Sequence, residues 1–328
     1  MAHELVTVEE IGEAARRLDG VAVRTPLLPA PRLAEGLLIK PESLQPTGSF
    51  KLRGAYSAIS ALPDDARRRG VVAHSSGNHG YAVAYAAALL GVHAVVVVPK
   101  TAPRVKTEAI AAAGADLVTV EPTLRAREEA AAGLVDRDGR TLIPPFEDRR
   151  VIAGQGTIGL EIAADCPQAD LVLVPVSGGG LISGIAAAVH ATNTGTAVVG
   201  VEPEFAADAR DSLRKGERVG WPSESVARTV ADALRVERVG ALTFAHMREH
   251  VSAIVTVTDE EMLAAVRALA LDARLIAEPG GAAAVAAFLF RRDELPAART
   301  GVAVLSGGNI DPALLARVLG GGQSSGPG

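Results

Sequence analysis

LVLVPVSGGGLISGIAAAVH, residues 171–190, decides the fold, because an apolar run meets a helix-like segment there at three consecutive glycines. Leu171–Val176 carries no charged residue, as expected for a strand that is buried on both faces of a parallel sheet. Leu181–His190 is rich in alanine and begins directly after the glycines, as expected for a helix that covers such a sheet. This unit predicts an open α/β fold with mainly parallel sheets.

The same alternation continues along the rest of the chain. Thr7-Val8-Glu9-Glu10 is a capping box, so we expect a helix to begin there. Further strand-like runs lie at Leu37–Lys40, Val71–His74, Val92–Val98, Leu117–Val120, Ala197–Val201, Ala253–Val257 and Val302–Leu305. Further helix-like runs lie at Tyr81–Leu90, Arg104–Ala113, Ile152–Ala164, Glu260–Leu271 and Ala282–Phe290. Ligands of such folds bind at the carboxyl ends of the strands.

Composition narrows the class of protein. Of the 328 residues 48% are apolar and only 3% aromatic, so we expect cores of aliphatic side chains. The net charge is −5, and no basic stripe with interleaved aromatic residues indicates a nucleic-acid partner. No apolar run reaches the roughly 18 residues that span a bilayer, and the acidic N-terminus does not resemble a signal peptide. We expect a cytoplasmic protein with no membrane partner, in which the single cysteine, Cys166, is a packing residue.

Three strand ends carry small polar residues that suit a phosphorylated ligand. Residues 177–180, SGGG, can present backbone amides to a phosphate. Residues 75–79, SSGNH, precede a helix, where amides can bind a carboxylate and Asn78 can hydrogen-bond a ring hydroxyl. Ser306 can offer a neutral hydroxyl to an aromatic nitrogen. Each junction could also be an ordinary turn, since Ser, Asn and Gly favour turns.

Lys51 stands at a helix start. Only five of the 33 basic residues are lysine, and Lys51 follows the turn-rich stretch Gln45–Phe50. A helix N-terminus disfavours a cation, so the pKa of this amine should be lowered. A neutral amine can act as a nucleophile or carry a Schiff base. A surface lysine that opens a helix is the alternative.

Residues 154–159, GQGTIG, match the pattern G-x-G-x-x-G of dinucleotide-binding loops. The preceding stretch, Pro145–Arg150, is charged and begins with proline, and no acidic residue ends a second strand about 20 residues further on. We expect these glycines to serve helix packing. A nicotinamide-dependent oxidoreductase remains an alternative class.

Four segments in this order resemble one family. They are GSFKLRGA at residues 48–55, SSGNHG at 75–80, VIAGQGTI at 151–158 and LSGGN at 305–309. Together they are similar to fold-type II pyridoxal-phosphate enzymes, in particular serine/threonine dehydratases and serine racemases. The resemblance extends from Thr25 to Asn309. It implies a tryptophan synthase beta-like fold of two open α/β domains, with the cofactor in the cleft between them.

The resemblance also implies roles for individual residues. Lys51 would form the Schiff base with pyridoxal 5'-phosphate and move the α-proton, and Ser76 would be the opposite-face base of a racemase. The other implied cofactor contacts are Phe50 beside the ring, Asn78 at the ring hydroxyl, Ser177, Gly178, Gly179, Gly180 and Leu181 at the phosphate, and Ser306 at the pyridine nitrogen. The implied substrate-binding residues are Ser75, Ser76, Gly77 and His79.

Residues 202–208, EPEFAAD, resemble the cation site of metal-activated relatives. Glu202 and Asp208 would supply carboxylates and Ala206 its backbone carbonyl, and such oxygen ligands suit Mg²⁺ or Ca²⁺. Mn²⁺ is a further possibility. A solvated acidic loop is the alternative.

Several activities fit the resemblance. The favoured one is β-elimination of L-threonine or L-serine to a 2-oxo acid and ammonia, because Phe146 stands where racemases tend to have a polar residue. Serine racemisation stays open, as does dehydration of threo-3-hydroxyaspartate, for which Arg127 could contact the second carboxylate. A non-catalytic relative that only binds the cofactor is a further alternative.

The resemblance predicts the organisation of the chain as well. We expect a large cofactor-binding domain from residues 1–62 and 148–328 and a small, mobile substrate-binding domain from residues 63–147. Residues 320–328 are expected to form a flexible tail, because they are rich in Gly and Ser. Relatives are commonly homodimers, so we expect a homodimer.

Overall fold

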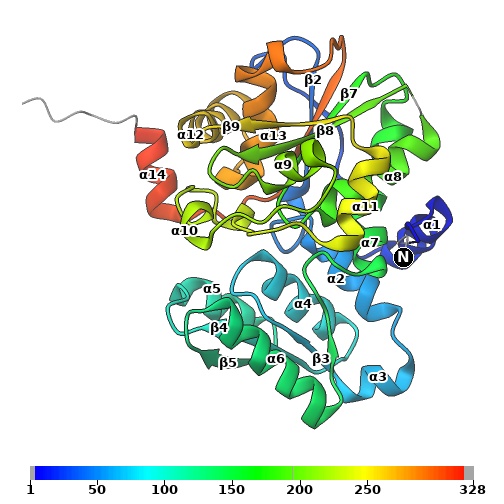
Figure 1. Cartoon of the computed structure of the whole chain (residues 1–328), viewed down its shortest axis with the longest axis vertical. Coiled ribbons are helices and arrows are strands. Elements are labelled where there is room, and N and C mark those ends of the chain that lie inside the picture. Colours follow the sequence, from blue (N-terminus) through cyan, green and yellow to red (C-terminus); the bar gives the residue numbers. More distant parts are fainter. Residues whose placement is uncertain (1–3, 194, 321–328) are drawn as a thin grey trace, which may run out of the picture.

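The computed structural model describes residues 4–193 and 195–320, and these form two sheets in two units (Figure 1). The larger sheet has six strands in the order β1-β2-β10-β7-β8-β9, and the smaller has four in the order β5-β4-β3-β6. Among these strands only β1 and β2 pair in antiparallel fashion. The predicted α/β fold with mainly parallel sheets is confirmed.

The larger sheet has helices on both faces because its strands are apolar on both sides. Its strands are β1 (Leu28–Pro29), β2 (Leu37–Pro41), β7 (Leu171–Pro175), β8 (Ala197–Pro203), β9 (Ala253–Val257) and β10 (Gly301–Leu305). In β7, Leu171 and Leu173 pack in one core with α12 (Asp259–Ala268) and α13 (Pro279–Phe290). Val172 and Val174 pack in another core with α7 (Arg149–Asp165) and α8 (Gly180–Thr192). Successive side chains point to opposite faces of a strand, so each face has its own core.

The smaller sheet follows the same plan with fewer strands. Its strands are β3 (Val71–Ala73), β4 (Ala94–Pro99), β5 (Asp116–Val120) and β6 (Thr141–Leu142). In β4, Val96 and Val98 pack with α4 (Asn78–Leu89), whereas Val95 and Val97 pack with α6 (Leu124–Asp138). All four strands come from one continuous stretch, and the strands of the larger sheet come from both sides of that stretch.

The sequence patterns located most elements. Every predicted strand is present, and its ends lie within two residues of the predicted ones. The remaining helices are α1 (Val8–Leu18), α2 (Lys51–Ser60), α3 (Asp64–Arg69), α5 (Arg104–Ala112), α9 (Asp208–Lys215), α10 (Ser223–Val226), α11 (Ala241–His250) and α14 (Pro312–Gly320), with short helical turns η1 (Glu42–Leu44), η2 (Asp232–Leu234), η3 (Leu269–Ala273) and η4 (Arg292–Glu294). The two-residue strands β1 and β6 are too short to show a period of two in the sequence.

Local chemistry sets the helix ends. Thr7 and Glu10 form the predicted capping box, in which each side chain accepts a hydrogen bond from the backbone N–H of the other residue. The regular part of α12 ends at Ala268, short of the predicted end at Leu271, because the π-helical turn η3 follows it. Gly320, the first residue of the expected tail, ends α14, and the other residues of that tail lie outside the described part of the chain. Among the described helices, none is long and apolar enough to cross a membrane.

The glycines of GQGTIG lie inside α7, where they allow close helix packing. A Cβ atom on Gly154 would lie 2.5 Å from the carbonyl oxygen of Arg53 in α2, and one on Gly159 would lie 2.7 Å from that of Ile185 in α8. The predicted packing role is confirmed, and the dinucleotide-loop alternative is wrong because no strand-to-helix turn is present here. Cys166 follows α7 and is buried in the core beneath it, so its predicted packing role is also confirmed.

Candidate active site

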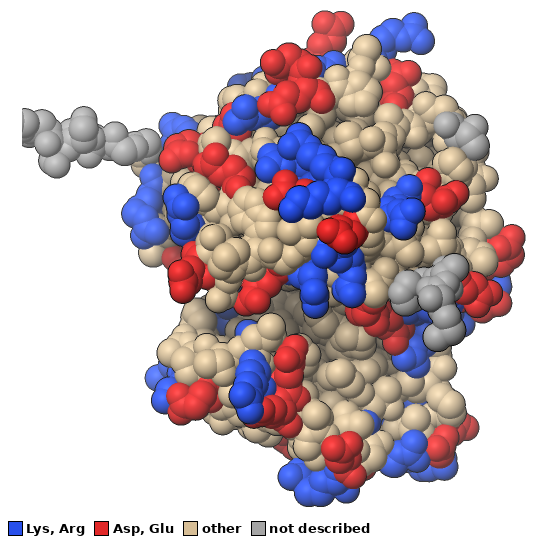
Figure 2. Space-filling model, in the orientation of Figure 1, with Lys and Arg blue, Asp and Glu red and all other residues tan. Residues whose placement is uncertain are grey.

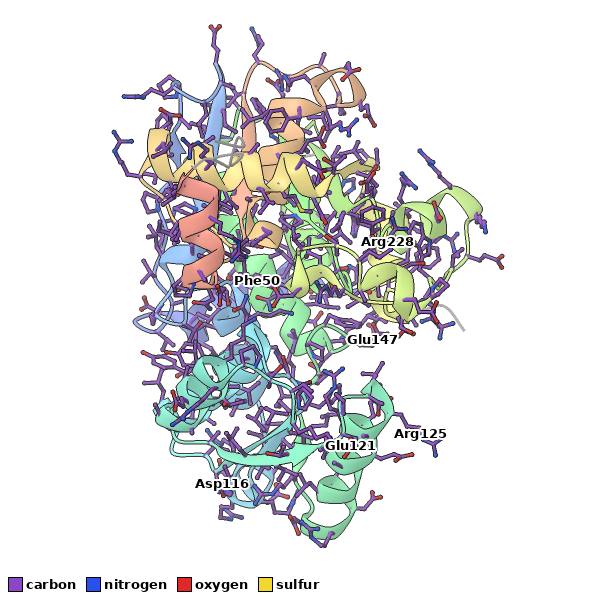
Figure 3. The ribbon with its side chains drawn as sticks, turned by 90° about the vertical axis from the view of Figure 1, so that its left-hand side faces the viewer. Phe50, Asp116, Glu121, Arg125, Glu147 and Arg228 are labelled. Carbon is purple, nitrogen blue, oxygen red and sulfur yellow. The ribbon has the colours of Figure 1, made fainter. Side chains whose placement is uncertain are left out.

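Two loops at the carboxyl ends of neighbouring strands lie side by side. β2 and β10 are adjacent in the larger sheet, and each is followed by a motif that the sequence had singled out. The Phe50 backbone N–H donates to the Ser306 carbonyl at 3.0 Å, and Gly308 N–H donates to the Gly48 carbonyl at 2.9 Å. These bonds place the start of α2, with Lys51, next to Ser306. Figure 3 shows Phe50 at the level where the two units meet, and Figure 2 shows a recess between the units.

Lys51 is the first residue of α2 and is only partly exposed. Its Nζ donates to the Pro145 carbonyl at 2.8 Å and lies 5.0 Å from the centre of the Phe50 ring. Desolvation lowers the pKa of this amine to about 8. The direction of this pKa shift is the one predicted, but the cause is burial rather than the helix dipole. Within the described residues no carboxylate pairs with the amine, so no charge partner offsets the desolvation that lowers its pKa.

The glycine loop leads from β7 into α8 and is shaped by two neighbouring side chains. A Cβ atom on Gly178 would lie 2.1 Å from the Phe146 ring, and one on Gly180 would lie 2.9 Å from Phe146 Cβ. Gly179 has φ of +93°, and Thr243 Oγ1 donates to the Gly178 carbonyl at 2.7 Å. Close packing against Phe146 therefore requires glycine at positions 178 and 180. Their backbone N–H groups lie at the start of α8, where amides have no partner within the helix.

Leu181 and Ser177 flank this loop. Leu181 is buried, and its side chain packs in the core below the larger sheet, so only its backbone N–H is suited to a phosphate. Ser177 is half-buried between β7 and the glycines.

Asn78, the first residue of α4, joins the smaller unit to the larger one. Its Nδ2 donates to Glu278 Oε1 at 2.6 Å, and its Oδ1 accepts from Asn309 Nδ2 at 2.8 Å. Glu278 in turn donates its backbone N–H to the Gly307 carbonyl. Asn78 thus lies beside the loop of Ser306. The sequence analysis did not single out Glu278, whose only local signal is an acidic residue directly before the Pro-Gly-Gly start of α13.

The loop between β3 and α4 holds the predicted substrate-binding residues. Ser75, Ser76 and Gly77 are half-buried, and Ser75 Oγ accepts from the Gly77 N–H. His79 is buried, and its Nε2 donates to the Ile143 carbonyl at 2.8 Å. Desolvation lowers the pKa of His79 to about 3, so the ring is neutral. The His79 side chain therefore holds this loop against the strand end, and only its backbone N–H is suited to a substrate.

Glu202 and Asp208 lie together in the larger unit, at the end of β8 and the start of α9. The Glu202 carboxylate accepts from the N–H groups of Ala209 and Arg210, and Asp208 accepts from the Val239 N–H at 2.8 Å. Desolvation and the nearby Asp208 raise the pKa of Glu202, and desolvation raises the pKa of Asp208 to about 7. In the described part of the chain no third His, Cys, Asp or Glu joins them in a metal-binding group.

Two α/β units with an amine of lowered pKa and a glycine loop at the strand ends between them define an enzyme class that binds a phosphorylated cofactor. The family model described as "Pyridoxal-phosphate dependent enzyme" matches residues 18–307. The chain belongs to this family.

The relatives of this chain include ammonia-lyases and serine racemases. The chain is 41% identical to the L-threonine ammonia-lyase of Thermotoga maritima over 96% of this chain and 78% of the relative. It is 37% identical to the L-threo-3-hydroxyaspartate ammonia-lyase of Saccharomyces cerevisiae over 98% of each chain. The structure of maize serine racemase superposes with a TM-score of 0.91 at 34% identity, over 95% of this chain and 96% of the other. The predicted family resemblance is confirmed.

Proposed function

We propose that this chain is a pyridoxal-phosphate-dependent ammonia-lyase that converts L-threonine or L-serine to a 2-oxo acid and ammonia. The observation that carries the proposal is the position of Lys51: its amine is desolvated, and the preceding residue, Phe50, is hydrogen-bonded to the Ser306 backbone at the end of the larger sheet. The ammonia-lyase relatives, which align over nearly the whole chain, support it. The presence of Lys51, Asn78 and Ser306 and the lowered pKa of Lys51 argue against a non-catalytic relative.

The residues present fit the cofactor. Lys51 would bind it covalently, the amides of Gly178, Gly179 and Gly180 would hold the phosphate, and Phe50 would pack beside the ring. Asn78 would bind the ring hydroxyl and Ser306 the ring nitrogen. A Cβ atom at Gly178 would close the cradle, as its clash with Phe146 shows. When bound, the cofactor supplies an electron sink for charge that develops at the α-carbon of the substrate.

Individual side chains have separate roles in the proposed reaction. The neutral amine of Lys51 takes the proton from the substrate α-carbon at Nζ, and burial keeps this amine partly deprotonated at neutral pH. The amides at the start of α4, with Ser75 and Ser76, bind the substrate carboxylate. Ser306, which is 5% exposed, would donate a hydrogen bond from its hydroxyl to the ring nitrogen and, because the hydroxyl is neutral, would leave that nitrogen unprotonated. This arrangement favours prompt loss of the β-hydroxyl over racemisation.

A divalent cation is part of the proposal. Desolvation and the nearby Asp208 raise the pKa of Glu202, and a cation between the two carboxylates would offset this unfavourable burial of charge. The Ala206 carbonyl and water would complete the coordination of Mg²⁺, Ca²⁺ or Mn²⁺, since only two carboxylates are available among the described residues.

We also propose that residues 63–147 form a small domain that closes over the substrate, as enzymes do to exclude water. Lys106 in α5 and Asp232 in η2 form an ion pair between the two units, which supports such a movement. A homodimer stays a prediction from the resemblance, and a cytoplasmic location stays a prediction from the sequence.

Dehydration of threo-3-hydroxyaspartate is a second candidate, favoured by one observation. Desolvation and the positive charge of Arg127 in α6 lower the pKa of His74, so this charge lies near the residue that precedes the substrate loop. A cation at this place suits a second substrate carboxylate. Serine racemisation has Ser76 and the similarity to several serine racemases in its favour.

Release of 2-oxo acid tests the proposal. The purified protein is incubated with pyridoxal phosphate, Mg²⁺ and, in turn, L-threonine, L-serine and L-threo-3-hydroxyaspartate. Rapid release from threonine or serine is expected, and Lys51→Ala should abolish it while the fold persists. Arg127→Gln should impair only the reaction of hydroxyaspartate. Appearance of D-serine without any oxo acid would replace the lyase by a racemase.

A further inference from the structure

A buried carboxylate lies behind Asn78, and the proposed mechanism does not use it. Glu278 is 5% exposed and accepts from Asn78 Nδ2 at 2.6 Å. It forms no ion pair with any described residue, and although it is the N-cap of α13, its side chain makes no capping hydrogen bond. A buried carboxylate without a cation is costly. Neither helix capping nor charge pairing therefore explains why a carboxylate is buried at position 278.

A chain of hydrogen bonds fixes the orientation of the Asn78 amide. The Thr47 carbonyl can only accept, so Asn309 must turn Nδ2 toward it, at 2.9 Å. The same Nδ2 lies 2.8 Å from Asn78, which must therefore present Oδ1 to it. Asn78 is left with its NH₂ group facing Glu278. One N–H of this group goes to the carboxylate, and the second is free for another acceptor.

Charged groups from two further elements act on Glu278. Desolvation and Asp232 of η2 raise the pKa of Glu278, the hydrogen bond from Asn78 and Lys106 of α5 lower it, and together they bring it to about 7. Asp232 and Lys106 themselves form an ion pair at 2.6 Å. Because these two act in opposite directions, the ionisation of Glu278 can be displaced either way by single substitutions.

We propose that Glu278 is a positioning residue, which holds the Asn78 amide toward the cofactor ring and sets the charge beside the ring hydroxyl. This inference rests on the proposed function, because Asn78 meets the ring only if the cofactor binds there. An ionised carboxylate requires Asn78 as its donor and disfavours a second negative charge on the ring oxygen. A protonated carboxyl group does neither, so the ring oxygen then gives up its proton more readily.

The visible absorption of the bound cofactor reads out this charge. The holoenzyme is titrated across roughly pH 5.5 to 8.5, the range over which Glu278 changes charge. We expect a spectral transition in the wild-type protein that is lost in Glu278→Gln, which keeps an amide acceptor for Asn78 but cannot ionise. Asp232→Asn should move the midpoint to lower pH and Lys106→Gln should move it to higher pH.

Cofactor affinity provides a second readout. Glu278→Ala frees the Asn78 amide and should raise the dissociation constant of pyridoxal phosphate about tenfold, the loss of roughly one charge-assisted hydrogen bond. Glu278→Gln should change it much less. Equal losses in both variants, or a transition that persists unchanged in Glu278→Gln, would overturn the inference. Absence of any bound-cofactor absorption in the wild-type protein would instead reject the proposed function.

Discussion

Lys106 Nζ lies 2.6 Å from Asp232 Oδ2, and this ion pair joins α5 of the smaller unit to η2 of the larger one. Exposed pairs contribute about 0.2–1 kcal/mol, so Lys106→Gln or Asp232→Asn should change KM by no more than about fivefold. The effect should shrink at high salt, because salt screens partly exposed charges. Steady-state kinetics at two salt concentrations measure this.

Arg125→Gln is the matched control for that pair. Arg125 and Glu129 form an ion pair of 2.6 Å within α6, so its loss does not alter contact between the units (Figure 3). An equal change of KM in Arg125→Gln would contradict a role for the Lys106 pair in closure.

The stability of the cofactor-free protein should also depend on pH through the ionisation of Glu278. Its pKa rises from 4.5 to about 7 on folding, so the folded state binds the proton more tightly. Stability from this group is fully present below the unfolded pKa and is lost as pH rises toward 7. As the pH rises from 4.5 to 7, the free energy of unfolding of Glu278→Gln should therefore increase relative to that of the wild type, by up to roughly 3 kcal/mol. Urea denaturation at several pH values measures the difference, and a pH-independent difference would count against the buried charge.

The loop glycines should respond to substitution in two separable ways. Gly178→Ala places a methyl group against the Phe146 ring, and such overpacking costs about 1–3 kcal/mol. We expect lower thermal stability and weaker cofactor binding. In the double variant Gly178→Ala/Phe146→Ala the clash is gone, so any loss of affinity that persists belongs to the phosphate contact. Gly133→Ala, whose added methyl meets nothing, should be neutral or slightly stabilising.

The carboxylates of Glu202 and Asp208 should make the protein sensitive to chelators. A chelator should lower the melting temperature, and Mg²⁺ should restore it, because the metal relieves the repulsion between two buried carboxylates. Asp208 has a pKa of about 7, so Mg²⁺ should bind more weakly at pH 6 than at pH 8 as protons compete. Thermal melts with Mg²⁺ titrations at both pH values test this. Glu202→Gln should be indifferent to the chelator, and a wild type that is equally indifferent would argue against the site.

Arg53 should be far more important for stability than its neighbour Lys51. Arg53 is 1% exposed and pairs with both Glu42 and Glu161, while Lys40 reaches the same Glu161. Removing one partner from such a network costs about 3–5 kcal/mol, because the remaining charges stay buried. Arg53→Leu should therefore lower the free energy of unfolding by that amount in urea denaturation. Lys51→Ala, two residues away, should leave it nearly unchanged, and similar losses in both would refute the assignment.

The amino-acid sequence by itself determined the architecture. Leu171–Val176 and the other apolar runs alternate with helix-like segments, and this pattern depends only on local periodicity, which short windows of sequence contain. The motifs around Lys51, Asn78 and Ser306 were visible for the same reason, because each is continuous and stands at a strand end. The family resemblance could be recognised in the same way, because it rests on short continuous motifs.

Only the tertiary structure decided which distant groups meet. Glu278 is an ordinary helix-start residue in the sequence and becomes part of the site because α13 begins against the loop of Gly307, 200 residues from Asn78. The low pKa of Lys51 comes from burial by other elements rather than from its own helix. Burial and hydrogen bonding between separate segments depend on how the two sheets pack, and no local pattern encodes that arrangement.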